Sequence, residues 1–275
     1  MASREEWIGR TGAEWARRGD ALERLLGPAG AHGLSALAVR PGERVLDIGC
    51  GSGASTEALA SAVGSGGHVT AVDVSPDLLK LARARLEGAD NVTIREADAG
   101  CTELTPPADA LFSRFGSMFF DDPPAAFANL HASLKPAARA VFVAWREPAR
   151  NQWASVPMTF SSEGHLPAAP PSGPGPFAWA SPGVFHTVLE GAGFREIHET
   201  PHEFMAEISE GDDPDPVIRA ANFMLRIGPV AVRLRGAPEE AKAEAAAFLR
   251  QRLARHEQDG AVRLLASAWV IEART

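Results

Sequence analysis

Short β-branched runs alternate with helical runs between Glu43 and Glu147, and this alternation limits the possible folds more than any other feature of the sequence. It is typical of βαβ units, whose strands lie parallel in one sheet and whose helices cover both faces. Strands are expected at residues 44–48, 68–74, 91–95, 108–113 and 140–145. We therefore predict an α/β fold with a doubly wound, Rossmann-like and mostly parallel sheet.

Two of the expected helices carry recognisable start signals. Ser75 precedes Pro76, and Asp122 precedes Pro123, so each pair supplies a side-chain cap and a proline at the first helical position. Apolar residues at helical spacing are expected to form the buried faces: Leu78, Leu81, Ala82 and Leu86 in the first helix, and Phe127, Leu130 and Leu134 in the second.

The pattern becomes irregular after Trp145. Residues 148–181 contain PAAPPSGPGP and little periodicity, which suits a lid over a binding site and a plain surface excursion equally well. The later elements are expected to be a helix over 182–190, a strand over 193–200, helices near 216–226 and 238–255, and an antiparallel final strand over 266–273.

These elements predict a single domain over residues 1–275. Its core is expected to comprise residues 40–147, 182–200 and 266–273. Helical elements that cover the substrate are expected in residues 1–30, 148–181 and 201–265.

The charge balance and the cysteines narrow the possible partners. With 27 basic and 35 acidic side chains the net charge is -8, so the surface repels phosphate polyanions and nucleic acid is not expected as a partner. No stretch approaches the roughly 18 apolar residues of a membrane span, and the first 20 residues are polar, which favours a cytoplasmic protein. Cys50 and Cys101 have neither disulfide-framework nor zinc-site spacing, and no metal is expected.

A glycine-rich loop, VLDIGCGSG at residues 45–53, follows the first strand. At the carboxyl edge of a parallel sheet such a loop lets the backbone approach a ligand closely. Its glycines alternate as G-x-G-x-G and not as the G-x-G-x-x-G of dinucleotide folds, and Asp47 precedes them inside the strand. A carboxylate here suits a cation better than a pyrophosphate. S-adenosylmethionine has an ammonium group, a sulfonium and no phosphate, and is therefore the expected cofactor.

Two further acids follow the second and third strands. Asp73 ends the second strand, where a carboxylate can accept hydrogen bonds from ribose hydroxyls, although nicotinamide-dependent dehydrogenases use an acid there as well. Asp98, in EADAG at residues 96–100, is placed either to accept from an adenine amino group or to serve as a turn residue.

The ordered motifs VLDIGCGSG, AVDVS, EADA and ALFSRFG resemble those of class I S-adenosylmethionine-dependent methyltransferases over roughly residues 43–147. The resemblance implies S-adenosylmethionine as cofactor and S-adenosylhomocysteine as product. It implies these cofactor contacts: Gly49, Gly51 and Gly53 under the methionine part, Asp47 near its amino group, Asp73 on the ribose, Asp98 near the adenine, the Ser113 carbonyl on the ammonium, and Cys50, Val74, Ala97 and Ala99 beside them. The wider pattern, including NQWASVP, is similar to bacterial small-molecule methyltransferases related to the ubiquinone and menaquinone group.

Several residues near the same edge are candidates for binding the methyl acceptor. They are Arg114, Phe115, Met118, Trp145, Asn151 and Trp153. Arg114 either holds an anionic substrate or forms a structural ion pair, and we favour the ion pair. Phe115 and Met118 either line an apolar pocket or pack in the core. Trp145, Asn151 and Trp153 either contact the substrate at the active edge or pack beneath the following loop.

No catalytic residue is assigned from the sequence. Methyl transfer is an in-line displacement in which positioning supplies much of the rate, and a base is needed only where the acceptor must lose a proton. The histidines beyond the core, His165, His186, His198 and His202, are each expected to be surface or packing residues rather than bases. Trp7 and Trp15 belong either to a lid or to an amphipathic helix packed on the sheet.

We therefore predict a methyltransferase acting on a small, partly hydrophobic molecule. The alternatives are a nicotinamide-dependent oxidoreductase, disfavoured by the glycine spacing and by Asp47, and a catalytically idle domain that binds the cofactor. Oxygen, nitrogen, carbon and sulfur acceptors all remain open, as does the oligomeric state.

Overall fold

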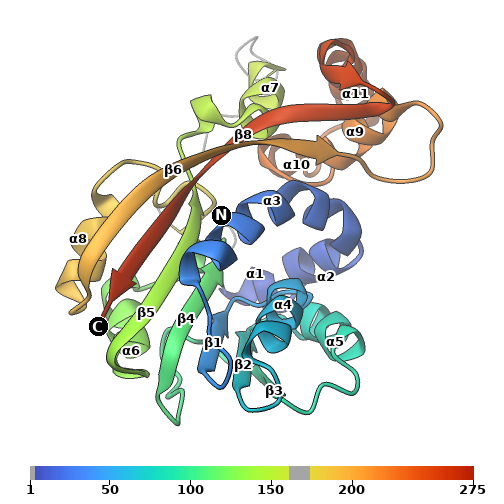
Figure 1. Ribbon diagram of the computed structural model, residues 1–275. Helices are drawn as coiled ribbons and strands as arrows, with labels where there is room; N and C mark the ends of the chain where they lie inside the picture. Colours follow the sequence, from blue (N-terminus) through green and yellow to red (C-terminus); the bar gives the residue numbers. More distant parts are fainter. Residues whose placement is uncertain (1–3, 161–173) are drawn as a thin grey trace.

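The computed structural model describes residues 4–160 and 174–275, and within them eight strands form one sheet (Figure 1). Their order is β3-β2-β1-β4-β5-β8-β6, with the short β7 paired with β8 beside this path. The strands are β1 (Arg44–Ile48), β2 (His68–Asp73), β3 (Val92–Glu96), β4 (Ala108–Arg114), β5 (Leu134–Trp145), β6 (Arg195–Ile208), β7 (Glu257–Gln258) and β8 (Ala261–Arg274). Strands β1 to β5 are parallel, and β8 is antiparallel to β5 and β6. This arrangement confirms the predicted doubly wound sheet and its antiparallel final strand.

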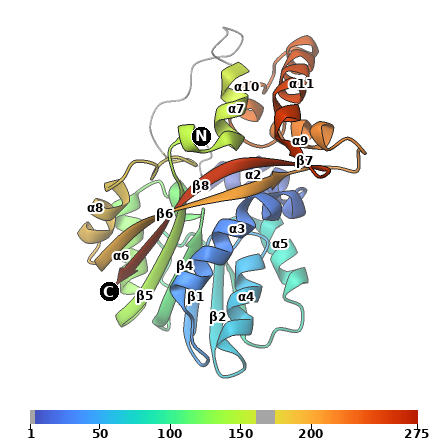
Figure 2. The ribbon, with the colours of Figure 1, turned by 45° about the horizontal axis from the view of Figure 1, so that its top comes forward.

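Helices cover both faces of the sheet. They are α1 (Arg4–Ile8), α2 (Arg10–Ala16), α3 (Gly19–Leu37), α4 (Ala54–Val63), α5 (Pro76–Arg85), α6 (Pro123–Ala132), α7 (Gln152–Phe160), α8 (Val184–Gly191), α9 (Pro216–Met224), α10 (Pro229–Arg233) and α11 (Glu239–Leu253). Helices α3, α4 and α5 lie on one face, and α6 and α8 lie on the other (Figures 1 and 2). The aromatic ring of Phe142 in β5 lies 5.4 Å from that of Phe127 in α6 and 5.4 Å from that of Phe185 in α8.

The order of the strands reverses at the centre of the sheet. The chain moves outward from β1 through β2 to β3, and then returns to place β4 on the other side of β1. At such a reversal the loops at the carboxyl ends of the two neighbouring strands lead in opposite directions and leave a crevice between them. A binding site is therefore expected beyond the ends of β1 and β4.

Strands β6 and β8 extend past the carboxyl end of β5 as a two-stranded arm. The last pair between β5 and β8 is Trp145 with Ala268, whereas β6 and β8 continue to pair as far as Ile208 with Val262. Helices α7, α9, α10 and α11 gather at this arm (Figure 1). The expected strands over 193–200 and 266–273 were thus too short, because the alternation of exposed and buried residues in β6 continues to Ile208.

Several local expectations can be compared directly with the structure. Ser75 Oγ accepts from the Leu78 N–H at 3.4 Å, and Asp122 Oδ1 accepts from the Ala125 N–H at 3.1 Å, which confirms both caps. The expected face of α5 was wrong at Leu81, which is 36% exposed, because α5 packs on the sheet through Leu78, Leu79 and Ala82.

Two boundaries also differ from the expectation. Leu134 is buried as expected but begins β5, since α6 ends at Ala132. The region after Trp145 contains the helix α7, although Pro157 lies inside it, so residues 148–181 are not loop throughout.

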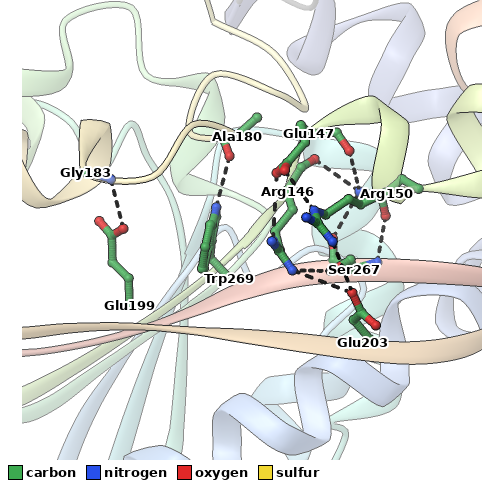
Figure 3. Close-up of polar contacts among 10 residues, drawn as sticks. Arg146, Glu147, Arg150, Ala180, Gly183, Glu199, Glu203, Ser267 and Trp269 are labelled. Atoms are coloured by element: carbon green, nitrogen blue, oxygen red, sulfur yellow. Dashed lines mark hydrogen bonds and ion pairs between the residues drawn. The ribbon is translucent and has the colours of Figure 1, made fainter.

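A polar network attaches the segment after β5 to the arm (Figure 3). Arg146, 8% exposed, donates from Nη1 to Ser267 Oγ at 3.2 Å, and its guanidinium carbon lies 4.5 Å from the centroid of the Trp269 ring. Trp269 Nε1 in turn donates to the Ala180 carbonyl at 3.0 Å. On β6, Glu199 accepts from the Gly183 N–H at 3.0 Å. These contacts fasten the segments that precede α7 and α8 to β6 and β8.

Candidate active site

A cavity of about 420 Å³ opens at the carboxyl edge of the sheet, at the reversal between β1 and β4. The loops after β1, β2, β3 and β4 form one side of it, and helices α1, α2 and α3 form the other. Trp15, Leu22, Leu26, Phe115 and Phe119 give it a largely apolar wall. Its volume falls in the range of roughly 300–1,000 Å³ that is typical of small-molecule sites.

Glycines shape the loop after β1. Gly49, Gly51 and Gly53 have φ angles of 69°, 54° and 85°, which side chains rarely tolerate. Gly49 also touches Gly116 in the loop after β4, and a Cβ at Gly49 would stand 2.8 Å from Gly116 Cα. The two loops therefore meet backbone to backbone beside the cavity. Burial raises the pKa of the Cys50 thiol in the same loop well above its usual value, which does not favour a reactive thiolate.

Asp47 is completely buried at the end of β1. Its Oδ2 accepts from Ser55 Oγ at 2.8 Å and from Thr56 Oγ1 at 2.6 Å, both at the start of α4. Oδ1 has no hydrogen-bond partner among the residues described. Burial raises the pKa of this carboxyl group from 3.8 to about 6, because the two hydroxyl hydrogen bonds and the charge of Arg114 offset only part of the lost hydration. Asp47 is thus a carboxylate that a nearby cation would stabilise.

Asp73 faces the cavity from the end of β2 and also holds the glycine loop in place. Its Oδ2 accepts from the Gly51 N–H and its Oδ1 from the Ser75 N–H, each at 2.9 Å. Burial raises the pKa of its carboxyl group, against the lowering effect of these backbone hydrogen bonds. Each carboxylate oxygen keeps a second lone pair for a ligand.

Asp98 lines the cavity after β3. Its Oδ1 accepts from the Gly100 N–H at 2.8 Å, which is the turn role expected as an alternative. Its Oδ2 lies 3.5 Å from Nε of Arg4, so α1 is tied to this side of the cavity.

Arg114 and Glu23 form an ion pair in the opposite part of the cavity wall. Nη1 of Arg114 donates to Oε2 of Glu23 at 2.9 Å, and Nη2 donates to Oε1 at 2.5 Å. The two side chains are 11% and 26% exposed. The structure thus contains the ion pair that we favoured for Arg114. Because Glu23 already neutralises the guanidinium, this geometry argues against Arg114 as the holder of an anionic substrate.

The residues expected around the cofactor lie together. Gly49, Cys50, Gly51, Asp73, Val74, Ala97, Asp98 and Ala99 line the cavity. Asp47, Gly53 and Ser113 are buried, each next in sequence to a residue that lines it.

The remaining acceptor candidates divide into two groups. Phe115 lines the cavity and stacks on Trp145, with ring centroids 4.1 Å apart. Met118, Trp145 and Trp153 are 1%, 3% and 7% exposed and belong to the hydrophobic core. Their positions match the alternatives of core packing for Met118 and of packing beneath the loop for Trp145 and Trp153. Trp145 supports Phe115 from behind and is itself contacted by Trp153, with ring centroids 5.0 Å apart.

Asn151 is also a buried structural residue. It is fully buried, accepts from the Ser267 N–H through Oδ1 at 2.9 Å and donates from Nδ2 to the Ser267 carbonyl at 3.0 Å. Trp153 Nε1 also donates to Asn151 Oδ1, at 3.1 Å. This amide satisfies the backbone of β8 where β5 has ended.

The N-terminal helices supply the part of the wall that the sequence indicated least clearly. Trp7 and Trp15 both line the cavity, with ring centroids 5.0 Å apart. Helix α2 packs closely on the start of α5, since a Cβ at Gly12 would stand 2.1 Å from Ser75 Oγ. We did not single out Glu23, because a glutamate on a helix usually marks a solvated face.

The histidine candidates lie elsewhere or outside the described residues. His165 falls in the undescribed range. His186 donates its backbone N–H to Glu199, and His198 lies exposed in β6. His202 stacks on His32 of α3 with ring centroids 4.0 Å apart, and partial burial and the nearby His32 lower its pKa.

The described parts of the chain lack two further kinds of feature. Among residues 4–160 and 174–275, no helix has the length and hydropathy of a membrane span. In the same residues, no group of three or more His, Cys, Asp or Glu side chains is arranged to hold a metal ion.

Comparison with known proteins finds similarity to methyltransferases over part of the chain. Residues 45–137 match the family model described as a methyltransferase domain. The demethylmenaquinone methyltransferase of Clavibacter sepedonicus is 37% identical over 114 residues, which are 41% of this chain and 45% of that protein. An uncharacterized protein of Mycobacterium tuberculosis is 40% identical over 99 residues, 35% of each chain. The chain therefore spans about half, or less, of the curated relatives it matches.

Solved structures show the same fold at low sequence identity. The YcgJ protein of Bacillus subtilis superposes with a TM-score of 0.58 at 14% identity, covering 90% of this chain and 98% of that one. A phosphoethanolamine N-methyltransferase of Haemonchus contortus, in complex with S-adenosyl-L-methionine, gives a TM-score of 0.51 at 18% identity, covering 89% of this chain and 52% of that one.

Proposed function

We propose that the chain transfers a methyl group from S-adenosylmethionine to a small, partly hydrophobic molecule. Two similarities support this: residues 45–137 match a methyltransferase-domain model, and the chain is similar to a demethylmenaquinone methyltransferase over 114 residues. The observation that carries this proposal is the combination of a cavity at the β1/β4 reversal with a buried, partly unpaired carboxylate beside it. The oxidoreductase alternative has no support in these comparisons, because the family model that matches is that of a methyltransferase.

The residues present fit S-adenosylmethionine. The unpartnered Oδ1 of Asp47 and the backbone of the glycine loop suit the cationic methionine end. The Asp73 carboxylate, anchored by the Gly51 and Ser75 amides, suits two ribose hydroxyls. Asp98 and Ala99 would lie near the adenine, and Ser113 would offer its carbonyl to the ammonium.

The chemistry requires positioning more than acid-base catalysis. S-adenosylmethionine would supply an activated methyl group on its sulfonium. Trp7, Trp15 and Leu22 would exclude water from the cavity, and Phe115 would present a flat apolar surface to the acceptor. Holding two reactants in line can supply about 7–11 kcal/mol of the barrier reduction in well-oriented systems.

Calorimetric titration of S-adenosylmethionine into the purified protein tests the cofactor, with NADH as the control ligand. We expect binding of S-adenosylmethionine at micromolar concentration and at least tenfold weaker binding by Asp73→Ala, since hydrogen bonds to a carboxylate contribute about 1.5–3 kcal/mol. Binding of NADH in place of S-adenosylmethionine would refute the proposal. Turnover of any acceptor then separates an enzyme from a domain that only binds the cofactor.

A further inference from the structure

We propose that Glu23, positioned by Arg114, is the polar contact for the methyl acceptor, and that the cavity selects neutral or cationic acceptors carrying a hydrogen-bond donor on an apolar body. This inference rests on the proposed function and assigns the chemical class of its second substrate.

The position of Glu23 places it on the acceptor side. The residues assigned to the ribose and adenine follow β2 and β3, whereas Glu23 lies on α3 opposite the end of β4. Arg114 follows Ser113, whose carbonyl is assigned to the methionine ammonium. The ion pair therefore lies toward the methionine end of the cavity, which is the end where the methyl group must leave the sulfonium.

The ion pair leaves Glu23 able to bind a ligand. Arg114 occupies one lone pair on each carboxylate oxygen, and an ionised carboxylate has about four acceptor positions. The Glu23 side chain is 26% exposed and lines the cavity beside Leu22 and Leu26. Such apolar surroundings strengthen a hydrogen bond to a carboxylate. A ligand without a donor group would leave the remaining lone pairs of Glu23 without a hydrogen bond.

The charge of the cavity excludes a further class of acceptors. Of its charged lining residues in the described chain, two are basic and five are acidic: Arg4 and Arg114, and Glu23, Asp73, Asp98, Asp121 and Asp122. Both arginines are already paired, with Asp98 and Glu23 respectively. No unpaired cation remains among these lining residues for a carboxylate or phosphate, so anionic acceptors meet a repulsive field.

Four probes with one ring system test this selection by calorimetry, with the protein saturated with S-adenosylhomocysteine. They are 2-naphthol, 2-naphthylmethylamine, 2-methoxynaphthalene and 2-naphthoate. We expect the naphthol and the amine to bind the wild-type protein at least about tenfold more tightly than the methoxy compound and the naphthoate. Equal binding of all four, preferential binding of the naphthoate, or binding of none would overturn the inference without any variant.

Glu23→Gln tests the residue itself, because it keeps the size of the side chain and removes its charge. We expect the preference for the naphthol over the methoxy compound to fall below about threefold, and the naphthoate to gain affinity because Arg114 loses its partner. The matched control is Glu239→Gln on α11, which removes a carboxylate from the exposed pair with Lys242 and should leave the preference unchanged. An unchanged preference in Glu23→Gln would overturn the assignment.

Binding of S-adenosylhomocysteine separates a failure of the proposed function from a failure of the inference about Glu23. A wild-type protein that fails to bind it refutes the proposed function. A protein that binds it but does not discriminate among the probes refutes only the inference about Glu23.

Discussion

Replacing Asp47 with asparagine is expected to make the ligand-free protein more stable at neutral pH. The carboxyl group is completely buried, and its pKa is raised from 3.8 to about 6. A raised pKa means that folding disfavours the ionised form of Asp47. The stability that the protonated group contributes is therefore fully present below pH 3.8 and is lost as the pH rises through about 6. The difference between 3.8 and about 6 corresponds to about 3 kcal/mol. Asp47→Asn, which resembles the protonated acid, should gain roughly that amount at pH 7.5.

Urea and thermal unfolding between pH 5 and pH 8 measure this effect. At pH 7.5 the free energy of unfolding of Asp47→Asn should exceed that of the wild type by about 3 kcal/mol, which corresponds to roughly 6–12 °C in Tm. At pH 5, where the carboxyl group of the folded wild type is largely protonated, the difference should be about half as large. The matched control is Asp109→Asn. The hydrogen bond from Lys135 and that from the Arg44 N–H outweigh partial burial and lower the pKa of Asp109, so this change should destabilise the protein at pH 7.5.

Asp47→Asn should also lose affinity for S-adenosylmethionine. Removing a carboxylate from beside the ammonium should weaken binding by about ten- to a hundredfold, as expected for a charged hydrogen bond. Wild-type affinity should fall as the pH is lowered from 7 to 5, because Asp47 must be deprotonated to attract the cation, and the variant should lack this component. An Asp47→Asn protein that is no more stable than wild type at pH 7.5, or that binds as tightly, would refute the reasoning.

Three further changes test the surroundings of the site. Gly12→Val should separate α2 from α5, because its Cβ would stand 2.1 Å from Ser75 Oγ, and should make the N-terminal helices more sensitive to trypsin while weakening cofactor binding. Asn151→Leu should destabilise the protein by about 2–4 kcal/mol in urea unfolding, since it leaves the Ser267 N–H and Trp153 Nε1 without their buried acceptor. His202→Gln should reduce the loss of thermal stability between pH 7.5 and pH 5.5, because a lowered histidine pKa makes the unfolded chain bind the proton first.

The parallel core was predictable because its strands and loops follow local rules. A strand buried on both faces is a short run of β-branched residues, and β1 occupies residues 44–48 as expected. The glycine spacing after it, and the acids that end β2 and follow β3, were visible without knowledge of tertiary contacts. These features predicted a binding site at the edge of the sheet, where the structure has its cavity.

The half of the cavity that we propose for the acceptor depends on contacts between distant parts of the chain. Glu23 and Arg114 are separated by 91 positions, and no local pattern indicates that they meet. Gly30 permits their approach, since a Cβ there would stand 2.6 Å from Arg114 Cδ, but a glycine within a helix does not reveal which side chain it admits. Asn151 is the opposite case, because a polar residue at the active edge suggests a ligand contact, whereas its hydrogen bonds in the structure go to Ser267 in β8 and to the segment after β5.

The carboxylates on the two sides of the cavity differ in the partners that they already have, and this difference supports the roles proposed for them. On the β1 side, the buried Asp47 keeps an oxygen without a partner, so the fold carries a free-energy cost that a bound cation would relieve. On the β4 side, Glu23 already has its cation in Arg114 and offers only lone pairs. A positively charged cofactor therefore has a reason to occupy the first position, and an acceptor that donates a hydrogen bond has a reason to occupy the second. Exchanging these ligands would leave the Asp47 carboxylate without a counter-charge, whereas Glu23, already paired with Arg114, would gain less from the charge of the cofactor.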